Sequence, residues 1–152
     1  MADELKGLGW SRQPAPSLDD IEALATAALE ALPQPFRDLC RDVTCYVQEF
    51  PDESDLDELG IESEFDLMGL FRGVGMTEVG DSPPTGRMPN SVWLYRRPIL
   101  DYWAEHEETL GHVVTHVLVH EMGHHFGFSD EDMEAIEEAA VREAKLPASS
   151  RR

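Results

Sequence analysis

Basic residues are scarce in this 152-residue sequence, and their scarcity excludes several classes of partner. The chain has 12 Lys and Arg residues against 31 Asp and Glu residues, which gives a formal net charge of −19 at pH 7. A surface this negative repels nucleic-acid phosphates and anionic lipids, so we expect neither a nucleic-acid nor a membrane partner. The charge itself is expected mainly to keep the surface solvated.

Cysteine is also scarce, which excludes a disulfide scaffold. The chain has two cysteines, Cys40 and Cys45, and each is flanked by apolar or strand-forming residues. Their neighbours favour small buried side chains. Their spacing suits a metal ligand pair only with a second Cys or His pair nearby, and the sequence offers none there.

Long hydrophobic runs are missing as well. No stretch approaches the roughly 18 apolar residues that a membrane span needs. The first ten residues, MADELKGLGW, lack the basic region and apolar run of a secretory signal. We therefore expect a cytoplasmic protein, and the length suits a single compact domain.

The sequence predicts an irregular lead-in over residues 1–16, one domain over 17–145 and a frayed tail over 146–152. Ser17 is expected to cap the first helix together with Asp20. Periodicity predicts helices over about 17–31, 107–126 and 131–145, and strands over about 42–50, 67–76 and 91–97. A short turn is expected over 35–39, and a loop with one helical turn over 51–66.

The stretch HEMGHHFGFSD, residues 120–130, carries the strongest chemical signal. On a helix, His120 and His124 lie one turn apart on the same face, so both imidazoles can reach one zinc ion at about 2.0–2.1 Å. Glu121 is rotated by about 100° from His120, which suits a general base better than a ligand. The pattern therefore predicts a zinc hydrolase site.

A catalytic zinc ion usually has three protein ligands. Gly127 is expected to reverse the chain just past the helix, which lets Asp130 turn back toward the metal as the third ligand. Asp130 has a competing structural role as N-cap of the final helix. Alternative third ligands are Glu131, Asp132 and Glu143.

Three neighbouring histidines are predicted not to bind the metal. His116 and His124 lie about 12 Å apart along a helix axis, so they cannot share one ion. His116 is expected to pack, or to support a ligand from behind. His112 is expected to be exposed and His125 to pack.

The extended pattern HExxHxxGxxD resembles the zincin superfamily, and specifically the bacterial zincin-like, or minimal, metallopeptidase family. The likeness extends over residues 18–142, including LMGLFRGVGMTE and SVWLYRRPILDYW. The resemblance implies that His120, Glu121, His124 and Asp130 bind or serve zinc. It also implies an α+β fold, in which a small mixed sheet packs against a buried active-site helix between N- and C-terminal helices.

Two features differ from the larger metzincin pattern. Asp130 stands where most metzincins have a third histidine, and Met133 lies too close to Asp130 to form a Met-turn. Little chain remains for a lower subdomain, so we expect a shallow cleft.

The predicted function is hydrolysis of peptide bonds in a peptide or protein substrate, with one Zn²⁺ ion and with Glu121 as general base. The alternatives are a non-catalytic metal-binding or interaction module and a hydrolase of other amides. The strand over 91–97 is expected to align a peptide along its edge. Tyr95 could donate a hydrogen bond to the oxyanion, but we expect it to be a packed strand residue. The Gly- and Pro-rich loop over 77–90 could act as a lid, but an ordinary surface loop is the simpler interpretation.

Overall fold

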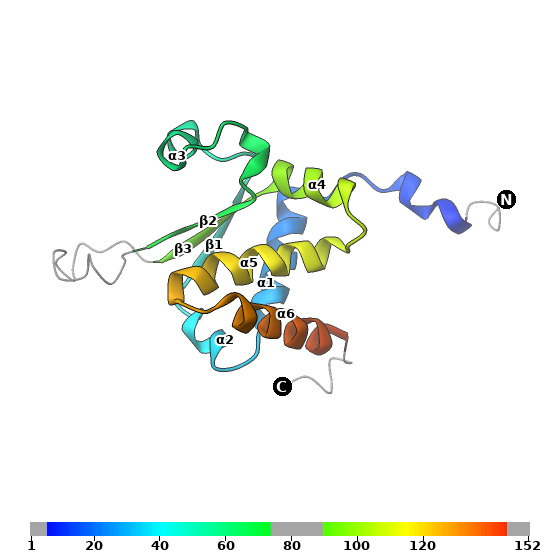
Figure 1. Cartoon of the computed structure of the whole chain (residues 1–152). Coiled ribbons are helices and arrows are strands. Elements are labelled where there is room, and N and C mark those ends of the chain that lie inside the picture. The colour runs from blue at the N-terminus through cyan, green and yellow to red at the C-terminus, as the bar shows by residue number, and fades with distance from the viewer. Residues whose placement is uncertain (1–5, 74–89, 146–152) are drawn as a thin grey trace.

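A three-stranded mixed sheet and the helix that packs on it form the centre of the computed structural model, which describes residues 6–73 and 90–145 (Figure 1). The strands are β1 (Thr44–Gln48), β2 (Gly69–Arg72) and β3 (Ser91–Tyr95). The helices are η1 (Lys6–Arg12), α1 (Leu18–Ala31), α2 (Phe36–Leu39), α3 (Glu53–Leu59), η2 (Glu64–Asp66), α4 (Arg96–Glu105), α5 (Leu110–Phe126) and α6 (Asp130–Lys145). The predicted α+β class is confirmed.

Helix α1 begins as the sequence predicts. The Asp20 backbone N–H donates to Ser17 Oγ at 3.0 Å, and the Ser17 N–H donates to the Asp20 carboxylate at 2.8 Å. This reciprocal pair satisfies two N–H groups that the first turn of a helix leaves without partners. The helix ends at Ala31, two residues before Pro33, which cannot continue it.

Strand β3 lies in the middle of the sheet, parallel to β1 and antiparallel to β2. Both of its edges are therefore paired, and the prediction that residues 91–97 offer an edge to a peptide is wrong. The alternating sequence of β3 fits a central strand as well as an edge strand, because the sequence of a strand does not show which strands pair with it. The edge strand next to α5 is β2 instead.

Helix α4 is the element that the sequence prediction missed. The predicted strand over 91–97 ends at Tyr95, and the chain turns directly into α4 at Arg96. Pro98 therefore belongs to the first turn of a helix, where its missing N–H costs nothing. Reading this proline as the end of a strand caused the error.

The remaining elements within the described residues agree in outline with the prediction, while the frayed tail predicted over 146–152 lies outside those residues. Helix α3 and the turn η2 lie within the segment over 51–66, and β2 lies within the strand predicted over 67–76. The lead-in contains the kinked segment η1. The loop over 77–90, considered as a lid, lies outside the described residues except for Asn90.

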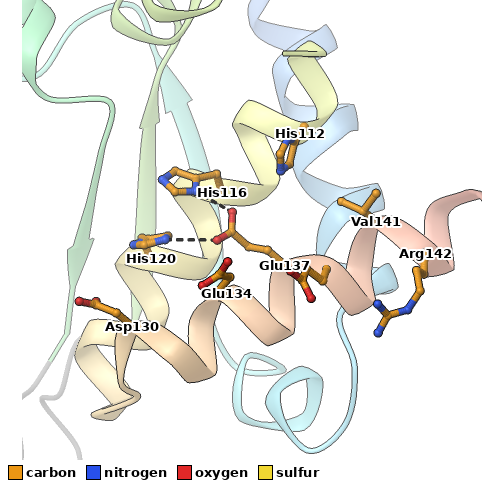
Figure 2. Close-up of a pocket in the computed structure, with 9 residues that line it drawn as sticks. His112, His116, His120, Asp130, Glu134, Glu137, Val141 and Arg142 are labelled. Atoms are coloured by element: carbon orange, nitrogen blue, oxygen red, sulfur yellow. Dashed lines mark hydrogen bonds and ion pairs between the residues drawn. The ribbon is translucent and has the colours of Figure 1, made fainter. Parts of the chain in front are cut away.

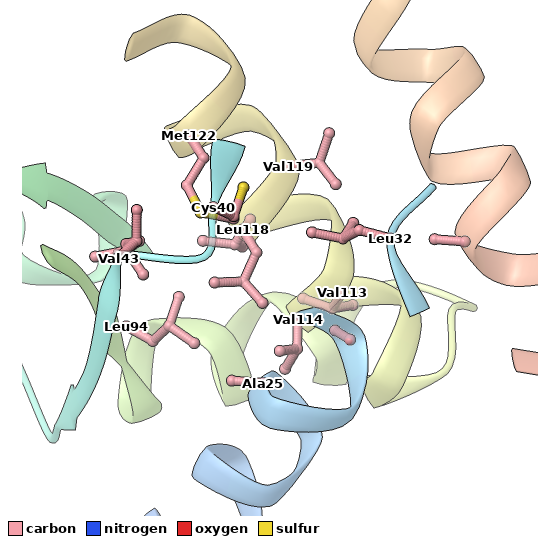
Figure 3. Close-up of a cluster of buried hydrophobic side chains, with 14 of the residues drawn as sticks. Ala25, Leu32, Cys40, Val43, Leu94, Val113, Val114, Leu118, Val119 and Met122 are labelled. Atoms are coloured by element: carbon pink, nitrogen blue, oxygen red, sulfur yellow. The ribbon is translucent and has the colours of Figure 1, made fainter. Parts of the chain in front are cut away.

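Helix α5 is surrounded by other elements on most of its circumference. It contacts α1, α4, α6, β2 and β3. Its buried apolar side chains meet those of α1 and β3 in the core (Figure 3), and these are Val113, Val114, Val117, Leu118, Val119 and Met122. The helix begins at Leu110 rather than 107 because the Thr109 side chain accepts a hydrogen bond from the His112 N–H.

The end of α5 is set by Gly127, as predicted. Gly127 has φ = 81°, a left-handed conformation that glycine adopts without steric cost. The Phe128 N–H then donates to the Gly123 carbonyl at 2.9 Å, so the helix end keeps its hydrogen bonds while the chain turns toward α6.

Both cysteines are free, and Cys40 is buried while Cys45 is half-buried. Burial raises the pKa of Cys40 to about 12 and that of Cys45 to about 11. The thiols therefore remain protonated and unreactive at neutral pH, as their apolar surroundings predicted. None of the described helices is long and apolar enough to cross a bilayer.

Gly69 allows β2 to approach α5. A Cβ atom at this position would lie 2.6 Å from Val117 Cγ1 and 3.2 Å from the Trp93 carbonyl oxygen. We expect Gly69→Ala to lower the free energy of unfolding by about 1–3 kcal/mol, because Val117 is too rigid to move aside. Urea denaturation measures the change. The control is Gly111→Ala in α5, where the nearest atom would be 4.0 Å away and no loss is expected. Equal effects of the two substitutions would contradict the close approach.

Candidate metal and catalytic site

Helix α5 carries two neighbouring stripes of polar side chains. One faces the edge strand β2: a Cβ on Gly69 would lie 3.4 Å from Glu121 Cγ, and the His125 ring stacks on Phe71 at 4.0 Å. The other stripe contains His112, His116 and His120 and lines a hollow beside α6. The adjacent residues His120 and Glu121 therefore lie on adjoining faces of the helix.

Glu121 is half-buried, and burial raises its pKa to about 7 from an ordinary value of 4.5. The cause is loss of solvation, which disfavours the charged carboxylate. A carboxyl group with a pKa near neutrality can accept and release a proton near neutral pH. This property supports the predicted role of Glu121 as a general base.

The hollow between α5 and α6 has a volume of about 680 Å³. Three histidines of α5 form one wall, and four carboxylates of α6 line the other side (Figure 2). The carboxylates belong to Asp130, Glu134, Glu137 and Glu138. Imidazole nitrogens facing carboxylate oxygens are a donor set that suits zinc.

Glu137 makes the tightest contacts in this hollow. Its Oε1 lies 2.6 Å from His116 Nδ1, and its Oε2 lies 3.3 Å from His120 Nε2. Figure 2 shows the Glu137 carboxylate between the two rings. One ligand atom from each of these three residues lies within 4.8 Å of the others, and this is the one such group of three or more in the described part of the chain.

The predicted ligands His120, His124 and Asp130 are not gathered as closely. The His120 and His124 rings are 5.9 Å apart between centroids, and both His124 and Asp130 are exposed. Asp130 nevertheless lines the same hollow as His120. The assignment of these three residues as zinc ligands therefore stays a prediction.

Ser129, and not Asp130, is the N-cap of α6. The Asp132 N–H donates to Ser129 Oγ at 3.1 Å, so Ser129 caps α6 and Asp130 is the first residue of the helix. The Asp130 carboxylate is thereby left for other partners.

The histidines outside the predicted set have mixed outcomes. His125 packs on Phe71, as expected. His112 is half-buried in the hollow rather than exposed. His116, predicted to pack or to act from behind a ligand, instead belongs to the clustered group with His120 and Glu137.

Glu137 is the site residue that sequence reasoning missed. Its side chain is 11% exposed, and it lies in register with the buried residues Met133 and Ala140 on one face of α6. A carboxylate on the apolar stripe of an amphipathic helix needs a buried partner. That signal was present in the sequence and could have identified it.

Tyr95 does not reach solvent as an oxyanion donor would. It is 1% exposed, and desolvation followed by the charge of Asp55 raises its pKa to about 12. The preferred interpretation, a packed strand residue, is confirmed.

Imidazole and carboxylate groups gathered along a buried helix are typical of metal-binding proteins. A family model described as zincin-like metallopeptidase matches residues 40–140, from the end of the α2 segment into α6. The chain belongs to this zincin-like metallopeptidase family. None of the curated proteins matches it.

The raised pKa of Glu121 makes a prediction for the metal-free protein. The unfolded carboxyl ionises near pH 4.5 and the folded one near 7, so its contribution to stability is full below 4.5 and is lost as the pH rises to 7. Ionisation in the folded state costs up to about 3 kcal/mol. Glu121→Gln lacks this loss, so the variant should gain stability relative to wild type between pH 4.5 and 7.

Urea denaturation of chelator-treated protein across this pH range measures the difference. The control is Glu107→Gln, which changes an exposed carboxylate that lies before α5 and should alter stability little. A difference between wild type and Glu121→Gln that does not change with pH would contradict the shifted pKa.

Proposed function

We propose that this protein is a zinc-dependent peptidase in which Glu121 is the general base. The observation that carries the proposal is the placement of Glu121: a half-buried carboxyl with a pKa of about 7, next to His120 and beside the edge strand β2. Membership of the zincin-like metallopeptidase family supports the same function.

In this proposal His120, His124 and Asp130 hold the ion. The one-turn spacing of the two histidines on α5 supports the first two ligands. Gly127 and the Ser129 cap support the third, because they return the chain to α5 and leave the Asp130 carboxylate without a capping role. Zinc bound there supplies a Lewis acid that polarises the scissile carbonyl and activates water.

Glu121 performs the proton transfers. Its carboxylate takes a proton from the attacking water and later delivers that proton to the leaving amine. Its half-buried position supports this role, because a carboxylate with few surrounding waters is a stronger base than one in bulk solvent. His120 and His124 contribute only as ligands.

The substrate is proposed to bind as an added strand along β2. Within the described residues β2 pairs with β3 on one side only, which leaves the backbone groups of its other side for a peptide. Gly69 brings this strand against Glu121. The ion pair between Arg72 and the buried Asp55 fastens the far end of β2 to α3.

One observation favours a second candidate function, a metal-binding module without catalysis. Glu137 links His116 and His120 of α5 to α6, so an ion there would hold the two helices together. Such a module would bind zinc and cleave no peptide.

Cleavage of a diverse peptide library by the zinc-loaded protein tests the proposed function. Wild type should cleave members of the library, and Glu121→Gln should lower the rate by at least about 100-fold while zinc remains bound. Mass spectrometry of the products measures cleavage, and metal analysis measures zinc.

Glu107→Gln serves as the control, because this exposed carboxylate lies before α5 and should leave the rate unchanged. Absence of cleavage by wild type that carries zinc stoichiometrically would reject the peptidase in favour of the binding module.

A further inference from the structure

The motif HExxH does not explain the placement of His116 and Glu137. Both residues lie outside the motif. Glu137 contacts His116 and also His120 of the motif, and the His116 ring lies beside the His120 ring. The His116 and His120 rings are 4.0 Å apart between centroids. His116, His120 and Glu137 are called the α5–α6 triad below.

We propose that the α5–α6 triad is itself a zinc site, an alternative position for the ion that shares His120 with the set containing His124. Two imidazoles and one carboxylate are a known protein ligand set for zinc. Two ligands of one tetrahedral zinc ion lie about 3.3 Å apart, given bonds of about 2.0–2.1 Å. His120 Nε2 and Glu137 Oε2 are separated by 3.3 Å, which matches this spacing. His116 Nδ1 and Glu137 Oε1 are 2.6 Å apart, a direct hydrogen bond that an ion would have to replace.

The burial of Glu137 supports a cation at this position. The residue is 8% exposed, and in the described part of the chain no Arg or Lys forms an ion pair with it. A buried carboxylate is costly unless an opposite charge or strong hydrogen bonds compensate for the lost solvation. The two imidazoles supply hydrogen-bond contacts, and a divalent ion between the three groups would supply the charge.

The surroundings favour entry of a cation. The hollow is lined by the carboxylates of Asp130, Glu134 and Glu138 and by one cationic side chain, Arg142, so negative charge predominates in it. The His116 side chain is 45% exposed and the His120 side chain 31% exposed, so an ion from solvent can reach both rings. Figure 2 shows His116, His120 and Glu134 near the Glu137 carboxylate.

The shared residue makes the two sites exclude each other. The proposal takes both sets to use His120 Nε2, the nitrogen that contacts Glu137, and one nitrogen cannot bind two ions at the same time. The chain should therefore hold about one zinc ion although it has two ligand sets. Where the proposed peptidase function holds, an ion in the α5–α6 triad takes His120 from the catalytic set.

Zinc titration of the full chain against a chromophoric chelator tests the proposal, with metal analysis giving the stoichiometry. The double variant His124→Gln/Asp130→Asn removes two ligands of the motif and should still bind about one ion. Adding His116→Gln to it should weaken zinc binding by more than about 10-fold, and His120→Gln should weaken both sites. His112→Gln in the same double-variant background is the matched control, since His112 lines the hollow without joining the triad.

Glu137→Gln gives a second test, and circular dichroism establishes whether this buried substitution leaves the fold intact. If the fold is lost, the test rests on the variants with and without His116→Gln, because the His116 side chain is half-exposed and its substitution disturbs the core less. Loss of zinc binding by His124→Gln/Asp130→Asn to the level of His120→Gln would overturn the proposal. So would equal binding with and without His116. Two ions bound to wild type would overturn the sharing of His120.

These titrations use no substrate, so their failure is distinguishable from failure of the proposed function. If the zinc-loaded wild type cleaves no peptide, the proposed peptidase function is rejected, and the proposed zinc site at the α5–α6 triad is not affected. A peptidase whose zinc binding ignores His116 and Glu137 would reject the triad alone.

Discussion

The packing of α5 against its neighbours is the constraint on which the site depends. Contacts with α1, α4, α6 and the sheet take up most of its surface and bury its apolar residues. Glu121 lies on the face of the helix toward β2, and His112, His116 and His120 lie on the face toward the hollow beside α6. Because the residues are adjacent in sequence, His120 and Glu121 must lie on adjoining faces, with the proposed metal ligand beside a desolvated carboxyl. The positions of His120 and Glu121 therefore follow from which faces of α5 are not buried in the hydrophobic core.

The contact between α5 and α6 determines which groups meet His120. Gly127 reverses the chain direction, and Ser129 caps α6, which begins at Asp130. The two helices approach closely at Gly123, where a Cβ atom would meet the Met133 side chain. This approach brings Glu137 of α6 to within hydrogen-bond distance of α5, so the same hollow contains His120 of the motif and carboxylates from outside the motif.

Features that depend on nearby residues were predictable from the sequence. The Ser17 capping box, the Gly127 turn and the long buried helix follow from hydrogen bonds and periodicity within a few positions. Features that depend on distant pairing were not: the central place of β3 and the turn of α4 directly after Tyr95 are set by tertiary packing. Glu137 lies between these cases, because its place on a buried helical face was visible while its partners His116 and His120 were not.

The proposed site is organised around His120 as a zinc ligand. Crystals of the zinc-loaded protein, measured on both sides of the zinc absorption edge, test this role of His120 directly. We expect an anomalous difference peak about 2.0–2.1 Å from an imidazole nitrogen of His120, with the remaining ligands drawn from α5 and α6. A zinc position with full occupancy that leaves His120 unbound would contradict it.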